Sequence, residues 1–196
     1  MIEFMMKKIF SIVVLSLLLN STSFSDEKNF DIEGFKLGDS LINTYTEELL
    51  QKNKQDYWKS KKITPIEFWP PHESTSTYSG FQFMFKTKDK ERKIIGLTAM
   101  RDYKDNIEDC FAEKDRLVGE MTNNLTGIKK ISKGRTFKLP DDRGSVTDIS
   151  FKFKSKAVIV VACYNYSEKI EKEKEWYDHI RISVRNKSYA SFLNNL

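Results

Sequence analysis

The chain of 196 residues contains only two cysteines and two histidines, and this scarcity excludes several classes of chemistry. Cys110 and Cys163 lie far apart in the sequence, whereas dithiol redox catalysis uses the Cys-x-x-Cys spacing. His72 and His179 have no second strong metal ligand at a recognised short spacing. The sequence therefore predicts no thiol redox centre, no metal site and no cofactor.

A run of about 20 apolar residues, the length needed to cross a bilayer, is also lacking. The N-terminal apolar run covers residues 9–19 and follows Lys7 and Lys8. A short apolar core between a basic start and small residues is typical of a secretory signal peptide. We expect cleavage after Ser25, which leaves residues 26–196 as a single domain without a transmembrane segment. A retained anchor is the alternative interpretation.

The compartment follows from the leader and from composition. Abundant Lys, Asn and Ile with little Ala indicate an AT-rich bacterial genome, which favours the periplasm, with an extracellular location as the alternative. The formal net charge of +5 is a mild excess that we interpret as spread along the chain, since Lys and Glu alternate over residues 168–175 on what reads as a solvated face. Because the protein is expected to leave the cytoplasm, nucleic acid is not an expected partner.

An even cysteine count in an exported chain favours a disulfide between Cys110 and Cys163. Cys110 lies on the apolar side of a helical pattern that we expect to open at Asp105, and Cys163 lies in a β-branched run typical of a buried strand. A bond between them would join a helix to the sheet. The alternative is two buried free thiols.

Periodicity along the rest of the chain predicts an α+β domain: a mainly antiparallel sheet built from hairpins, with helices packed on one face. The first helix is expected to begin at Asp39 or Ser40 as N-cap, with a second start at Thr46. The remaining expected elements are, in order, an exposed loop over 69–80, a hairpin over 81–100, the Cys110 helix, a hairpin over 146–166 with its turn at 154–156, a one-sided strand over 178–186 and a short helix over 187–196. In the one-sided strand, Ile180 and Ile182 point inward, so His179 is expected on the solvent side.

The residues Gly38, Asp39, Ser40 and Leu41 resemble the signature of the GDSL, or SGNH, esterases and lipases. That resemblance implies that Ser40 is a nucleophile, and a serine esterase is the alternative function. The family takes its base from Asp-x-x-His, but Trp176 stands three positions before His179 here, and no Gly-x-Asn-Asp block for oxyanion donors occurs. We therefore expect no catalytic residue.

Longer stretches, from "FDIEGFKLGDSL" through "DYKDNIEDC" and "CYNYSEKIEKEKEWYDHIRISV" to "FLNN", resemble a group of small exported proteins of unknown function from AT-rich alphaproteobacteria. The resemblance implies an architecture and a compartment, and it places the GDSL block at a strand-to-helix junction.

One cluster of aromatic residues remains as a candidate binding surface. Tyr164, Tyr166, Trp176 and Tyr177 flank the charged segment 167–175, and two antiparallel strands joined across it would bring the rings to one rim of the sheet. Such a rim can stack on a sugar or a peptide, and ordinary edge packing is the alternative. Trp58 and Trp69 can add to the same surface. The sequence thus favours a non-catalytic exported domain that binds a small molecule or an envelope protein.

Overall fold

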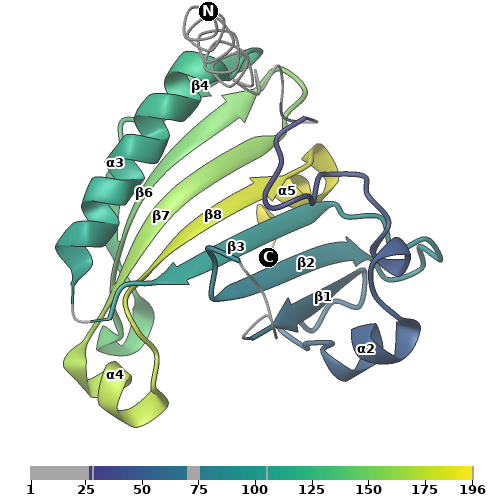
Figure 1. Ribbon diagram of the computed structural model, residues 1–196, viewed down its shortest axis with the longest axis horizontal. Coiled ribbons are helices and arrows are strands. Elements are labelled where there is room, and N and C mark those ends of the chain that lie inside the picture. Colours follow the sequence, from purple (N-terminus) through teal and green to yellow (C-terminus); the bar gives the residue numbers. More distant parts are fainter. Residues whose placement is uncertain (1–26, 28, 70–75, 105, 196) are drawn as a thin grey trace, which may run out of the picture.

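The protein folds around one antiparallel sheet, which confirms the expected α+β class (Figure 1). The computed structural model describes residues 27, 29–69, 76–104 and 106–195. The strand order is β1-β2-β3-β8-β7-β6-β4, and β5 also pairs with β6. The strands are β1 (Ile63–Phe68), β2 (Gly80–Lys86), β3 (Gly96–Asp102), β4 (Ile128–Ile131), β5 (Arg135–Lys138), β6 (Gly144–Phe153), β7 (Val158–Tyr166) and β8 (His179–Arg185).

Two of these pairings are the expected hairpins. β2 pairs with β3, and β6 pairs with β7 across the turn before Val158. The sheet is completed by β8, which lies between β3 and β7 and joins the two hairpins. Three strands were not predicted. β1 contains Pro65, which an edge strand tolerates, and β4 and β5 are only four residues long.

The helices are α2 (Glu47–Lys52), α3 (Ile107–Asn124), α4 (Glu168–Lys174) and α5 (Lys187–Leu193), with short 3₁₀ helices η1 (Leu41–Asn43) and η2 (Pro140–Asp142). α3 runs along one face of β7 and β8 (Figure 1). α4 occupies the charged connection between β7 and β8, where Ile170 is buried. Asn106 is the N-cap of α3, not Asp105 as predicted; Asp105 itself lies outside the described residues.

The α3 face of the sheet holds the main hydrophobic core. Its central residues alternate along four strands, as period-two side chains of a buried sheet face must. They are Phe81, Phe83 and Phe85, Leu97 and Ala99, Ile159 and Val161, and Ile180, Ile182 and Val184. Cys110 of α3 and Cys163 of β7 form the predicted disulfide, with their Cα atoms 6.0 Å apart. The bond therefore fixes the long helix to the centre of the sheet.

The opposite face has a smaller apolar cluster beneath α5. Tyr189 packs there with Ile63, Met84 and Ile95. A Cβ at Gly96 would lie 2.3 Å from the Tyr189 ring, so the close approach of α5 requires glycine at this position. α5 thus packs on the face of the sheet opposite α3.

The GDSL segment forms two short helical segments, as the second start signal at Thr46 predicts. The Thr46 hydroxyl accepts a hydrogen bond from the Leu49 N–H and caps α2. Ser40 occupies the N-cap position of η1, but its side chain caps nothing. Its hydroxyl donates instead to the Glu91 carbonyl, and the Asp39 carboxylate accepts from the Lys36 N–H. The predicted capping role of both side chains is therefore wrong, because each is held by a neighbouring turn.

Two further predictions lie outside the described residues: the signal peptide with its cleavage after Ser25, and most of the exposed loop after Trp69. Within the described ranges, the helices are too short or too polar to cross a membrane.

Candidate functional site

A cavity of about 870 Å³ opens on the sheet face opposite α3. Its floor is formed by side chains of β2, β3, β7 and β8 that point away from the main core, such as Gln82, Thr98, Tyr164 and Arg181. Residues near α4 and α5, and the segments flanking β1, supply its walls. The cavity is thus the second face of the same sheet whose first face forms the core.

The aromatic residues that line this cavity are tryptophans and tyrosines. All three tryptophans of the chain and five of its eight tyrosines line it, but none of the phenylalanines in the described part does. These aromatic lining residues are Tyr57, Trp58, Trp69, Tyr164, Tyr166, Trp176, Tyr177 and Tyr189. Phenylalanines instead fill the α3 face. The cavity therefore displays aromatic rings that carry a hydrogen-bonding group.

The four rings of the predicted rim all line this cavity. The ring centroids of Tyr164 and Tyr166 are 6.2 Å apart, and those of Tyr166 and Trp176 are 5.5 Å apart. Tyr177 carries the ammonium of Lys104 over its ring, 4.4 Å from the centroid. Trp58 and Trp69, which the sequence could not place, lie on the same cavity. The predicted rim is one end of a larger aromatic surface.

His179 is buried, with 4% of its surface exposed, so the predicted surface histidine is wrong. The strand alternation was read correctly, but the face that His179 shares with Arg181 is the cavity face and not open solvent. Its ring stacks on Tyr164, with centroids 4.8 Å apart. Burial, reinforced by the nearby charge of Arg181, lowers the pKa of His179 to about 3, and the imidazole is therefore neutral near pH 7.

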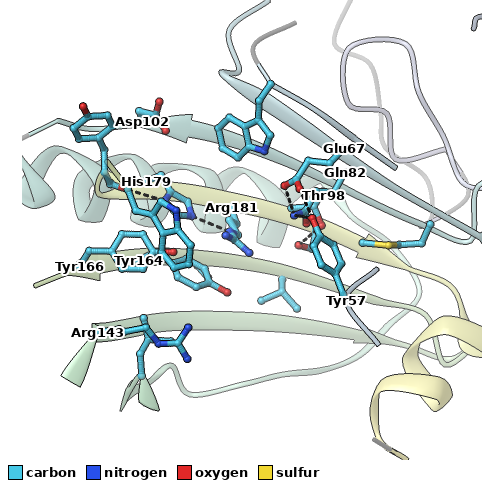
Figure 2. Close-up of a pocket in the computed structure, with 18 of the residues that line it drawn as sticks. Tyr57, Glu67, Gln82, Thr98, Asp102, Arg143, Tyr164, Tyr166, His179 and Arg181 are labelled. Atoms are coloured by element: carbon cyan, nitrogen blue, oxygen red, sulfur yellow. Dashed lines mark hydrogen bonds between the residues drawn. The ribbon is translucent and has the colours of Figure 1, made fainter. Parts of the chain in front are cut away.

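A neutral His179 fixes the position of Arg181. The Nδ1–H of His179 donates to the Tyr177 carbonyl, 2.8 Å away, which leaves Nε2 to accept from Nε of Arg181 at 2.8 Å. The guanidinium also lies over the Tyr164 ring, 4.3 Å from its centroid. In Figure 2, Arg181 lies between the rings of Tyr164, Tyr166 and His179 on one side and the Tyr57 cluster on the other.

Three arginines also line the cavity. Arg143, Arg181 and Arg185 line the cavity, and within the described part of the chain none of them forms an ion pair with Asp or Glu. In the sequence, Arg181 and Arg185 form a basic row on the same side of the one-sided strand as His179. The signal was present, but period-two alternation does not reveal that this row lines a cavity.

At the other end of the cavity, polar groups form a connected cluster. The Tyr57 hydroxyl donates to the Glu67 carboxylate, which also accepts from the Gln82 amide at 2.7 Å. Burial and this carboxylate raise the pKa of the Tyr57 phenol, so Tyr57 stays a donor. Nearby, the hydroxyls of Thr98 and Ser183 lie 2.8 Å apart. These groups offer hydroxyl and carboxylate partners to a bound polar molecule.

Ser40 lies away from this cavity. It bridges to Lys93, just before β3, whereas His179 pairs with Asp102 at the far end of that strand. The Ser40 hydroxyl donates to a backbone carbonyl, and both ring nitrogens of His179 are engaged elsewhere. The structure therefore does not bring Ser40 and His179 together. His72 lies outside the described residues.

Metal-ligand types are not clustered in the described residues, which hold no group of three His, Cys, Asp or Glu side chains able to bind an ion. Asp178, adjacent to His179, accepts a hydrogen bond from the Tyr166 N–H at 2.7 Å. Its role at this position is to hold the start of β8 against the end of β7. In comparisons with known proteins, the chain matches no protein-family model, no curated protein and no solved structure.

Proposed function

We propose that this protein is an exported, non-catalytic domain whose cavity binds an acidic sugar. The observation that carries the proposal is the gathering of every tryptophan and most tyrosines on one cavity, together with arginines that form no ion pair with any described Asp or Glu. The compartment rests on the predicted leader and on the disulfide, a bond that persists in oxidising compartments.

The aromatic lining suits a sugar ring. Sugar C–H faces stack on flat rings, while the polar edges of Tyr and Trp hydrogen-bond at the periphery of the ligand. A volume of about 870 Å³ lies within the usual range of ligand pockets and accommodates more than one sugar unit. The cluster of Glu67, Gln82 and Tyr57 supplies acceptors and donors for ligand hydroxyls. A purely apolar ligand would make no use of the remaining hydrogen-bonding capacity of these groups.

Arg181 supplies the preference for an anion. A guanidinium has five N–H donors. Arg181 uses one of them to bond His179, and it also forms a hydrogen bond with Tyr166, which opposes the rise that burial causes in the pKa of Tyr166. The remaining N–H donors are available to a ligand. The planar fork matches a carboxylate. Because Tyr164 and His179 hold the guanidinium in place, little side-chain entropy is lost on binding.

The same contacts argue against general-base catalysis by His179. A base that works near neutral pH needs a pKa close to 7, and that of His179 is lowered to about 3. Its two ring nitrogens are already occupied by Tyr177 and Arg181. His179 acts in this proposal as the group that positions Arg181.

The test uses the intrinsic tryptophan fluorescence, because every tryptophan lines the cavity. The purified protein is titrated with an oligosaccharide of hexuronic acids and with a neutral oligosaccharide of the same length. We expect a saturable change with the acidic sugar. Arg181→Gln should weaken its binding roughly 10- to 100-fold, as the loss of a charge-assisted hydrogen bond does. The control Arg116→Gln, on exposed α3 surface, removes one charge without effect.

Three results would contradict the proposal. Equal binding of both sugars would remove the anion-specific role of Arg181. No fluorescence change with either sugar, together with a ligand-free mass in native mass spectrometry of protein isolated from its own cells, would remove the binding function. Ester hydrolysis that Ser40→Ala abolishes in a folded protein would replace it with the serine esterase.

A further inference from the structure

All of the positive charge excess lies in one segment. Residues 127–157 contain nine Lys and Arg against three Asp, a net +6, whereas the whole chain carries +5. The rest of the protein is therefore close to neutral, at −1. The excess is not spread along the chain as the overall composition suggested, and the fold decides where this segment lies.

The fold places these charges along one edge of the sheet. β4 and β5 both pair with the outer side of β6, and the turn after β6 lies beside Gly127, whose carbonyl accepts from the Lys154 N–H. We define the basic edge as the eight exposed cations Lys129, Lys130, Lys133, Arg135, Lys138, Lys152, Lys154 and Lys156. The segments that carry them, 128–138 and 152–156, contain no acidic residue. Along β6, the edge extends from Lys154 to the residue that pairs with Lys138. At about 3.4 Å per residue, this distance is about 30 Å.

The charges of this edge are largely uncompensated. Lys130 lies directly opposite Lys152 across the β4–β6 ladder, a like-charge pair that destabilises a sheet. Arg135 forms an ion pair with the buried Asp148. Within the described ranges, the other members of the basic edge form no ion pair. The remaining acids of residues 127–157 are Asp141 and Asp142, in η2 beyond the end of β5. A surface that keeps a like-charge pair without internal counter-charge is suited to an external anionic partner.

Two exposed apolar side chains accompany the lysines. Ile131 is 36% exposed at the end of β4, and Phe137 is 42% exposed in β5. Of the other large exposed apolar residues, Tyr57, Trp69 and Trp176 belong to the cavity. The basic edge therefore combines cations with apolar tips, the combination that binds the headgroup region of a membrane.

We infer that the basic edge docks the protein on the surface of an anionic lipid bilayer. The cations without internal ion pairs are all lysines, which act as point charges on flexible stems and suit a fluid layer of headgroups better than a partner read by fixed geometry. The edge lies at the rim of the sheet, shares none of its eight cations with the cavity lining, and is independent of the function proposed for the cavity.

The experiment is sedimentation of the purified, leader-free protein with vesicles of phosphatidylcholine alone and with added phosphatidylglycerol. We expect binding to the anionic vesicles only, with release at high salt because exposed charges are screened. The variant Lys130→Gln, Lys133→Gln, Lys152→Gln, Lys154→Gln should weaken binding at least tenfold. The matched control is Lys52→Gln, Lys59→Gln, Lys88→Gln, Lys90→Gln, which removes the same charge from exposed lysines elsewhere and should bind like the wild type.

Additional arms decide the partner class. Ile131→Ser with Phe137→Ser should also weaken binding to the anionic vesicles, because it removes the exposed apolar side chains of the edge. Equal weakening by the two lysine variants would overturn the inference, as would no binding to anionic vesicles. Tighter binding to duplex DNA or to an acidic polypeptide than to vesicles, lost in the same variant, would assign the edge to that partner instead. Melting temperatures of all variants establish that they are folded.

Discussion

Acidification below pH 6.5 should destabilise this protein through His179. Burial and the adjacent Arg181 lower the pKa of His179 to about 3 in the folded state, whereas an unfolded histidine titrates near 6.5. Between these values the unfolded chain binds a proton that the folded protein does not. The contribution of His179 to the free energy of unfolding is therefore fully present above about pH 6.5 and is lost progressively as the pH falls towards 3.

The magnitude follows from one proton per molecule. The slope is about 1.4 kcal/mol per pH unit, so this histidine should cost about 2 kcal/mol of unfolding free energy between pH 6.5 and pH 5. Because carboxylates also titrate towards the acid end, the comparison is made with His179→Gln, which keeps a polar side chain but cannot titrate. Urea denaturation at pH 7 and at pH 5 should show that the wild type loses about 2 kcal/mol more than the variant.

NMR of the imidazole rings gives an independent measurement, since the chain has only two histidines. The His179 signals should stay those of a neutral ring with the proton on Nδ1 down to pH 5, as the bond to the Tyr177 carbonyl requires. A His179 ring that titrates near pH 6.5 in the folded protein would refute the reasoning. So would equal losses of stability in the wild type and the variant, and Arg181 would then lack its fixed acceptor.

Three further predictions concern the scaffold. Replacing Cys110 and Cys163 by Ala should lower the free energy of unfolding by on the order of 4 kcal/mol, from the sequence separation of 53 residues; a loss below about 1 kcal/mol in urea denaturation would contradict it. Gly144→Ala should destabilise by at least about 2 kcal/mol, because φ is 129° and a Cβ would lie 2.0 Å from the Asn165 carbonyl oxygen. Gly119→Ala, in helix α3 with no atom near the new Cβ, should instead stabilise by about 0.5–1 kcal/mol, and melting temperatures in the opposite order would reject both assignments.

Local patterns predicted the local parts of the fold. The alternation of Phe81, Phe83 and Phe85 sets one face of a strand within seven residues, and the polar connection that follows leads to its antiparallel partner. The disulfide was also predictable, because Cys110 and Cys163 each lie on the apolar side of a recognisable element. In both cases the deciding information lies within one or two elements.

The parts that failed depend on distant segments. β8 pairs with β3 across more than seventy residues, and neither strand carries a signal that selects the other. The capping prediction for Ser40 failed because the Glu91 carbonyl, remote in sequence, accepts its hydroxyl. Short strands such as β5, exposed along its whole length, have no buried face and hence no period-two pattern to detect.

The wrong prediction for His179 shows why side-chain alternation did not predict the candidate site. Alternation tells which residues share a face, and it grouped His179 with Arg181 and Arg185 correctly. It does not tell what covers that face, which depends here on Trp58 and Trp69 from segments flanking β1.

Residue chemistry separates the two faces where periodicity cannot. A phenylalanine has no hydrogen-bonding group and packs in a dry core without cost, whereas a buried tyrosine or tryptophan must find a partner for its O–H or N–H. Phenylalanines accordingly fill the α3 face, and the tryptophans and most tyrosines line the opposite face. On an open face their polar groups are hydrated until a ligand replaces the water. The segregation therefore supports the proposal that the second face exchanges water for a polar ligand. The guanidinium of Arg181, which forms no ion pair with the described residues, supports the proposal that this ligand carries negative charge.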